Sequence, residues 1–360
     1  MMNKLLYRTI LSIALFAGFF ALAGLPMASL AQQSALSSSE AVDVPLLVND
    51  PLENLQEYSL KGSQLTPIPP VPGGQMETAD FTRELLQMQW RQHDPMDVYV
   101  IRPKGVTRPP VAIYLYGFPV EDGRFRNDTF CKLVTQGGVA VIGFVPALTA
   151  ERYHDIPMKK WFVSELHDSI VKTVHDVQMV INYAAIRDDL DTTRVGIFGQ
   201  GSGATIAGLA ATVDPRISAV DLMDPWGDWP DWFANSKLVP QAERADFLKP
   251  EFLKALVPLD PLQWMPKLEG KALKVDDVMY DRGTPSDAKA KIEAVLPSSV
   301  RLVRYKSPEE FQENALKDGK LVTWIREQLT NRPGMANTNE AMQGTQSKRS
   351  EDAVQMRDSH

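Results

Sequence analysis

The sequence predicts an α/β fold, in which a mostly parallel, doubly wound sheet carries helices on both faces and a small cap. Short apolar runs alternate with helical segments from about residue 45 to 330. The runs are nearly continuous, as strands buried on both faces require. In such sheets the functional side chains lie just beyond the carboxyl ends of the strands, so the residues that follow each run are the candidates.

The elements are expected in a regular order along the chain. The apolar runs that predict strands are residues 97–102, 111–116, 138–144, 194–198, 217–223, 273–280 and 300–305. Helices are expected at 127–135, 159–185 and 204–212, and within the cap at 245–256. In the long helix one stripe is apolar and should face the sheet; it consists of Ile170, Val174, Val177, Val180 and Ile181.

Both ends of the chain are expected to lie outside this fold. Lys4 and Arg8 precede an apolar run, and Ser29-Leu30-Ala31 offers small residues to signal peptidase, so residues 1–31 are predicted to be a signal peptide. The polar leader 32–44 and tail 331–360 cannot offset their ordering entropy and are predicted to be disordered. We expect an exported protein, periplasmic or secreted, without a stable membrane span after cleavage. An uncleaved N-terminal anchor is the alternative, although the run is short of the roughly 20 residues that a span needs.

Charge and cysteine content exclude several classes of partner and site. The net charge of −7 becomes −9 when Lys4 and Arg8 are removed, which disfavours nucleic acid and anionic membranes. Cys131 is the only cysteine, so neither an internal disulfide nor a thiolate metal site can form. We expect Cys131 to be a buried filler on a helix.

A glycine-rich turn follows the strand expected at 194–198. The sequence Gly199-Gln200-Gly201-Ser202-Gly203 leads from this strand into a helix of small residues. A sharp strand-to-helix reversal leaves no room for Cβ atoms two positions before and two positions after its apex. The spacing therefore places the apex at Gly201.

With this turn the chain resembles the α/β-hydrolase superfamily, especially its secreted dienelactone-hydrolase-like and acetyl-esterase-like members. The resemblance covers roughly residues 97–329 and includes the helix with Asp176 and the run 189–196. It implies a nucleophile at position 201, where this sequence has glycine. Alternatively, the apex is displaced by one residue and Ser202 is the nucleophile; otherwise Ser202 lies in the first turn of the helix. The third interpretation, a phosphate-binding loop, lacks the Lys-Ser/Thr that such loops carry.

The resemblance also implies an acid and a histidine. Asp281 opens Asp281-Arg282-Gly283-Thr284-Pro285, which matches the D-x-x-T-P pattern that often carries the family's acid. Asp224 is a second candidate, and the alternative for Asp281 is that it simply starts a turn before a helix. The histidine should follow the last strand, but residues 306–329 contain none. The histidines of the chain, none at the expected position of the base, are His93, His154, His167, His175 and His360.

Two further segments should border the site. The family's first loop usually opens with His-Gly and helps to form the oxyanion hole; here it reads Tyr116-Gly117-Phe118. After the strand 217–223 comes a segment with three tryptophans and three aspartates, from Asp224 through Trp226 to Phe233. Its aromatic side chains are expected to anchor a cap at about 224–266; the alternative is that they stack on a sugar or hold a cation.

No metal or cofactor is expected. His167 and His175 are eight residues apart on the long helix, too far for one ion without other ligands, so we expect both on solvated helix faces.

Two functional hypotheses of different classes follow. The first is a catalytically degenerate pseudohydrolase that binds a small-molecule ligand or a partner in the old cleft. The second is an active carboxylesterase-like serine hydrolase that acts on an ester-like substrate through Ser202 with a non-standard base. A structural subunit of an envelope complex is a third, less specific interpretation.

Overall fold

The structure is a computed structural model that describes residues 53–61, 63, 65, 69–91, 94–117, 123–147, 158–316 and 319–330. The side chains of residues 158–165 and 315–316 are not part of this description. The expected signal peptide 1–31, leader 32–44 and tail 331–360 lie outside the described residues, as do Phe118, His93, His154 and His360.

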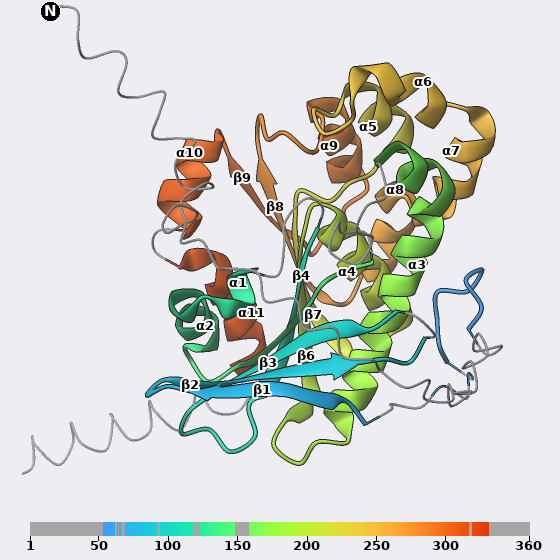
Figure 1. The fold of residues 1–360 in the computed structure, drawn as a ribbon. Coiled ribbons are helices and arrows are strands. Elements are labelled where there is room, and N and C mark those ends of the chain that lie inside the picture. The colour runs from blue at the N-terminus through green and yellow to red at the C-terminus, as the bar shows by residue number, and fades with distance from the viewer. Residues whose placement is uncertain are drawn as a thin grey trace, which may run out of the picture. The chain divides into compact units, whose positions relative to one another are not determined.

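Nine strands of the described chain form one mixed sheet in the order β1-β2-β3-β5-β4-β6-β7-β8-β9 (Figure 1). The strands are β1 Val71–Glu77, β2 Phe81–Met88, β3 Met96–Pro103, β4 Pro110–Tyr116, β5 Ala140–Phe144, β6 Asp191–Gln200, β7 Ile217–Met223, β8 Ala272–Val278 and β9 Arg301–Tyr305. β1, β2, β3 and β5 pair antiparallel, whereas the strands from β5 through β4 to β9 pair in parallel. The predicted fold class, a mostly parallel sheet flanked by helices, is confirmed.

The strands β1 and β2 were not predicted, and β8 is shorter than predicted. β1 is almost entirely exposed and contains proline and two glycines, so it carries no apolar pattern. β8 stops at Val278 because Tyr280 adopts a left-handed backbone with φ of 61°, which a strand cannot continue.

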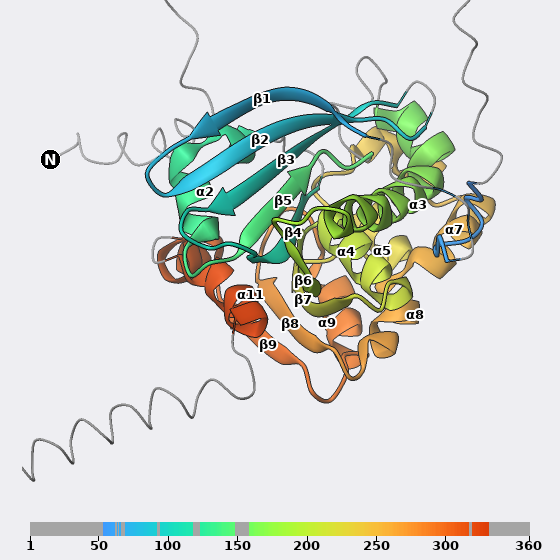
Figure 2. The ribbon, with the colours of Figure 1, turned by 90° about the horizontal axis from the view of Figure 1, so that it is seen from below.

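Helices cover both faces of the sheet. They are α1 Gly123–Arg126, α2 Asp128–Thr135, α3 Met158–Ala185, α4 Ser202–Val213, α5 Trp229–Asn235, α6 Arg244–Phe247, α7 Pro250–Leu256, α8 Pro261–Trp264, α9 Ser286–Ala294, α10 Pro308–Phe311 and α11 Lys320–Thr330. Short 3-10 turns occupy Gln241–Glu243, Val257–Leu259 and Met265–Leu268, and Gln312–Leu316 is a π-helical turn. Figure 2 shows α3 and α4 on one face and α2 and α11 on the other. Of the described helices, none is long and apolar enough to cross a membrane.

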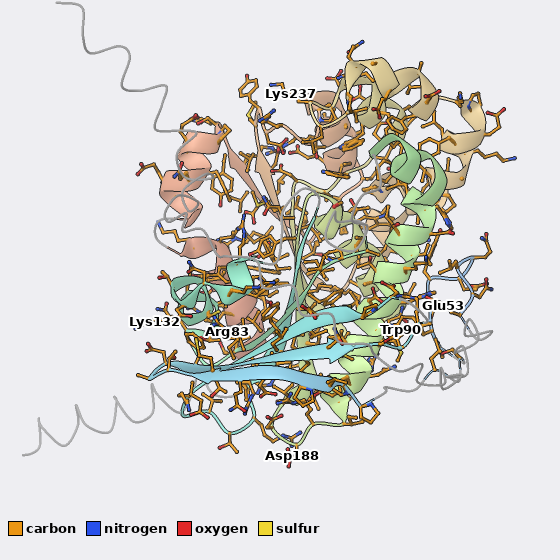
Figure 3. All side chains as sticks on the ribbon, viewed as in Figure 1. Glu53, Arg83, Trp90, Lys132, Asp188 and Lys237 are labelled. Carbon is orange, nitrogen blue, oxygen red and sulfur yellow. The ribbon has the colours of Figure 1, made fainter. Side chains whose placement is uncertain are left out.

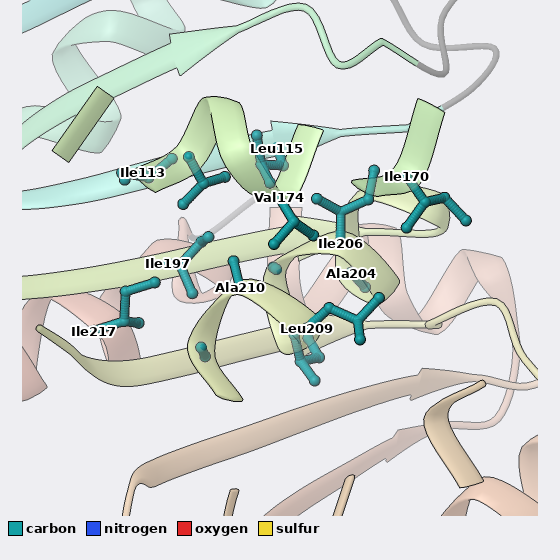
Figure 4. Close-up of a cluster of buried hydrophobic side chains, with 14 of the residues drawn as sticks. Ile113, Leu115, Ile170, Val174, Ile197, Ala204, Ile206, Leu209, Ala210 and Ile217 are labelled. Carbon is teal, nitrogen blue, oxygen red and sulfur yellow. The ribbon is translucent and has the colours of Figure 1, made fainter. Parts of the chain in front are cut away.

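The core under α3 and α4 is built from the predicted apolar stripe. Ile170 and Val174 of α3 pack with Ile206 of α4 against the strands, as Figure 4 shows. The rest of the stripe, Val177, Val180 and Ile181, is buried as well, as is Cys131 on the opposite face of the sheet. Packing of α4 between the buried strands and the apolar stripe of α3 fixes the position of α4, which begins at the glycine-rich turn.

The cap segment differs from the single helix expected at 245–256. The structure instead has two short helices, α6 and α7, separated at Lys249. Pro250 lacks an N–H and disfavours helical geometry in the residue before it, and Lys249 accordingly has an extended ψ of 134°. Asp260 holds the cap together by accepting hydrogen bonds from the backbone N–H groups of Asp228 and Trp229.

The expectation that His175 lies on a solvated helix face is wrong. Its side chain is completely buried beneath the segment that begins at Glu53. Nδ1 lies 2.8 Å from Glu53 Oε1, and Nε2 lies 2.8 Å from the Glu57 carbonyl oxygen. Arg91 donates to the same Glu53 carboxylate and to Asp176, close to Trp90 (Figure 3). This polar cluster fastens residues 53–60 to α3.

The cluster makes the attachment of this segment sensitive to acid. Burial would raise the pKa of Glu53, but hydrogen bonds from His175 and Arg91 outweigh burial and lower it. A lowered pKa gives a stabilisation that is present above the ordinary glutamate pKa and is lost as the pH falls through the folded-state pKa.

We therefore expect Glu53→Gln to lower the free energy of unfolding at neutral pH by about 2 kcal/mol, the value of a hydrogen bond to a charged group. In urea unfolding, the difference from the native protein should persist from pH 7 down to about 4.5, the ordinary pKa of glutamate, and should narrow at lower pH as Glu53 takes up a proton. Glu57→Gln is the control, since only the backbone carbonyl of that residue contacts His175. A difference that is independent of pH would contradict the prediction.

Candidate functional site

The glycine-rich turn between β6 and α4, residues 199–203, is a sharp bend with Gly201 at its apex. Gly201 has φ of 59° and ψ of −122°, and α4 starts at the next residue. A Cβ on Gly199 would lie 2.3 Å from the Gly203 carbonyl oxygen, and one on Gly203 would lie 2.4 Å from the Leu115 carbonyl oxygen. Both positions must therefore be glycine, as the spacing in the sequence predicts.

A cavity of about 390 Å³ opens above this bend, at the carboxyl ends of β4, β6, β7 and β8. Its lining consists of Gly117, Gln200, Gly201, Met223, Asp224, Trp226, Leu238, Val278, Tyr280, Asp281, Arg282, Gly283, Pro308 and Phe311. Candidates taken from four separate stretches of sequence thus meet in one place: Gly117, Gln200 with Gly201, Asp224 with Trp226, and Asp281. The volume lies within the range of about 300–1,000 Å³ that is usual for small-molecule sites.

Other candidates lie outside the described lining. Ser202 is 1% exposed, and its Oγ lies only 2.0 Å from the point where a Cβ on Gly117 would stand. Its hydroxyl is therefore packed against the first loop. Tyr116 is buried among Phe125 and Phe198, and burial raises the pKa of Tyr116 to about 12 even with Arg124 over its ring.

Asp224 and Asp281 share one cation, Lys289 of α9, which the sequence analysis did not single out. Lys289 Nζ contacts Asp224 Oδ1 and lies 2.8 Å from Asp277 Oδ1 and 3.4 Å from Asp281 Oδ2. Asp281 also accepts a hydrogen bond from the Thr284 backbone N–H, at 2.9 Å. Asp281 therefore has the geometry of a turn-forming residue, with Lys289 beside its carboxylate.

The electrostatics of this group follow from its burial. Burial, together with the charge of Asp281, raises the pKa of Asp224 well above its usual value. Burial would lower the pKa of Lys289, but the carboxylates of Asp224 and Asp281 more than compensate and raise it. Lys289 therefore remains a cation at neutral pH and cannot act as a general base.

The wall that follows β9, where the resemblance places a histidine, is formed by Pro308 and Phe311 of α10. Within the described lining there is no histidine at all. Neither proline nor phenylalanine can accept a proton. In the described part of the chain, no imidazole is therefore available at this cavity to accept a proton from a nucleophile.

Two residues of the lining adopt a left-handed backbone that is rare outside glycine. Asp224 has φ of 47° and Tyr280 has φ of 61°. Such a conformation costs about 1–2 kcal/mol per residue and persists where the surroundings impose it. Tyr280 is also 68% exposed. Strain is thus concentrated at the rim of the cavity.

A second buried charge cluster lies within the sheet, on strands β7 and β8, which end at the lining residues Met223 and Val278. Lys274 Nζ of β8 lies 2.5 Å from Asp276 Oδ2 and 3.4 Å from Asp221 Oδ2. Burial raises the pKa of Asp221 well above its usual value. These residues were predicted only as strand members, because an alternation of polar and apolar residues does not reveal which polar side chains are paired inside.

We expect Lys289→Met to lower the free energy of unfolding by about 3–5 kcal/mol, because removal of one partner leaves buried carboxylates without a counter-charge. Lys291→Met is the matched control on the same helix, where the lysine is exposed and its loss should be small. Urea unfolding followed by tryptophan fluorescence measures both. Equal effects of the two substitutions would contradict the role assigned to Lys289.

No protein-family model and no curated protein matches the sequence. Solved structures do resemble the chain. An acetyl xylan esterase from a Paenibacillus species superposes with a TM-score of 0.56 at 14% identity, over 71% of this chain and 87% of that one. Acetyl xylan esterase 1 from a Thermoanaerobacterium species gives 0.53 at 13% identity, over 77% and 94%.

An S-formylglutathione hydrolase from Agrobacterium tumefaciens gives a TM-score of 0.52 at 14% identity, over 72% of this chain and 99% of that one. At such low identity the likeness concerns architecture and carries no residue roles. It agrees with the strand order and with the bend at Gly201. The chain therefore has the α/β-hydrolase fold.

Proposed function

We propose that this protein is an exported member of the α/β-hydrolase fold that binds a small-molecule ligand in the cavity and does not hydrolyse it. One observation carries the proposal: the apex of the bend that lines the cavity is Gly201, which has no side chain to attack a carbonyl. Covalent hydrolysis in this fold needs a nucleophile at that apex.

The missing base supports the same conclusion independently. A serine nucleophile is activated by an imidazole that an acid orients. Here the described lining has no histidine, and Asp281 is engaged by Lys289 and by its own turn. When several members of a triad are absent, only the small acceleration that comes from binding remains.

The alternative is an active hydrolase that uses Ser202. Against it stands the position of this side chain, which is buried beside Gly117 and is not among the described residues that line the cavity. Its Oγ occupies the place of a side chain on Gly117, and it would still lack an imidazole in the described cavity.

A small organic molecule is the ligand class that fits best. The cavity volume of about 390 Å³ suits one. The similar structures are described as an acetyl xylan esterase and an S-formylglutathione hydrolase, both named for acyl-ester or thioester substrates. The acidic balance of the chain disfavours nucleic acid.

We expect the purified protein to remain unlabelled by a fluorophosphonate reagent and to hydrolyse p-nitrophenyl acetate no faster than buffer does. Labelling at Ser202 that disappears in Ser202→Ala would overturn the proposal. Mass spectrometry of the treated protein identifies the adduct site.

Gly201→Ser tests whether the missing hydroxyl alone accounts for inactivity. A Cβ at this position would lie 3.1 Å from Trp226 Nε1, a tight contact, in a left-handed conformation that costs about 1–2 kcal/mol. We expect a folded protein, destabilised by that amount, that still fails to hydrolyse the ester because no base is present. Turnover well above that of Ser202→Ala would contradict the proposal, because a general base would then have to lie outside the described residues.

Export is proposed from the N-terminal sequence. In a bacterial host, the native chain should appear in the periplasm or medium with Gln32 as its first residue. Ala31→Trp should block cleavage, because signal peptidase requires a small residue at that position. N-terminal sequencing of fractionated cells decides between cleavage and a retained anchor.

A further inference from the structure

The indole N–H of Trp226, a residue that lines the cavity, is a donor that a ligand can reach. The Trp226 side chain is 2% exposed and its ring lies 4.4 Å from the ring of Trp232. Nε1 lies 3.1 Å from the place of a Cβ on Gly201 and 3.3 Å from that of a Cβ on Gly283. Within the described part of the chain this N–H has no hydrogen-bond acceptor. Two glycines thus leave space in front of a donor that is free to bind a ligand acceptor.

Several acceptors around the cavity are, by contrast, already in use. Asp224 Oδ1 accepts from the Val278 backbone N–H and from Lys289, while Asp281 accepts within its turn. The backbone carbonyl of Met223 accepts from Gly201, and that of Gly283 accepts from Ser236. A ligand with its own acceptors therefore fits this part of the lining better than one with many donors.

Arg282 adds a cation at the rim. Its side chain is exposed and lines the cavity, and among the described residues no carboxylate lies within ion-pair distance of it. The nearby acids Asp224 and Asp281 would repel an anion, but Lys289 is bound to both of them. Lys289 thereby offsets part of their negative charge, and Arg282 remains available to a ligand.

Apolar side chains make up much of the remaining lining. They include Met223, Leu238, Val278 and Phe311. Such a surface gains free energy by covering a hydrocarbon chain or ring.

We propose that the ligand of this cavity is an organic acid with an apolar body, whose carboxylate accepts a hydrogen bond from Trp226 Nε1 in the space left by the missing Gly201 side chain and pairs with Arg282. The apolar body lies along Met223, Val278 and Phe311. This inference rests on the proposed non-hydrolytic binding function and names its ligand class.

Binding of matched acids and amides tests the proposal. The acids are butyrate, octanoate, phenylacetate and 4-phenylbutyrate, each paired with its primary amide, titrated by calorimetry into the native protein at low salt. We expect at least one acid to bind about ten-fold or more tightly than its amide, since a hydrogen bond to a charged acceptor is worth that factor or more. Added salt should weaken the acid and spare the amide.

Variants connect this preference to the named groups. Trp226→Phe should weaken the acid by about ten-fold, whereas Trp229→Phe, a matched tryptophan in the cap that is buried outside the described lining, should leave binding unchanged. Arg282→Gln, on an exposed loop where folding is not at risk, should weaken the acid and leave the amide unaffected.

The proposal is wrong if no acid in the series binds more tightly than its amide, or if Arg282→Gln and Trp226→Phe bind the acid as the native protein does. In that case a protein that stays unlabelled by the fluorophosphonate keeps the proposed non-hydrolytic function and loses only the ligand class. Labelling at Ser202 would instead contradict the proposed non-hydrolytic function, whether or not the acids bind more tightly than their amides.

Discussion

The close approach of α4 to strands β4 and β6 is the contact on which the site depends. Main-chain atoms at Gly199 and Gly203 meet at distances that no Cβ would permit, and Ser202 Oγ occupies the place of a side chain on Gly117. This packing turns the chain sharply at Gly201 and brings the ends of β6, β7 and β8 to one cavity. The architecture of a catalytic bend is thus complete, although its apex has no reactive atom. The shape of the bend does not depend on the side chain at its apex, because the flanking glycines impose it.

Lys289 determines what role the neighbouring carboxylates can take. In a serine hydrolase the acid orients an imidazole that alternates between neutral and charged forms. Here the carboxylates of Asp224, Asp277 and Asp281 surround an ammonium group whose pKa is raised, so the proton stays where it is. The same residues that could serve proton transfer instead join the loops after β7 and β8 into one rigid wall. The left-handed backbones of Asp224 and Tyr280 are held in this wall.

The fold and the bend could be predicted from sequence because both leave a local pattern. Buried strands such as β4 and β7 are apolar throughout, and Gly199, Gly201 and Gly203 carry their own spacing. Features that depend on distant partners could not be predicted. The exposed strand β1 has no apolar periodicity, and His175 is buried because Glu53 packs across it. Lys289 lies on a polar helix, where its sequence context does not distinguish it from a solvent-exposed lysine. The break between α6 and α7 does have a local signal, since Pro250 disfavours helical geometry in the residue before it.

Pro308 and Phe311, which occupy the wall after β9, bear on how such a protein could change over evolutionary time. A single base change converts most glycine codons into a codon for a larger residue, and serine at the apex is one step away for some of them. Under the proposed function a serine there would gain nothing by itself, since in the described part of the chain a second, unrelated change would have to install an imidazole where Pro308 and Phe311 stand. Either change alone leaves the cavity without one of the two groups that ester hydrolysis in this fold requires.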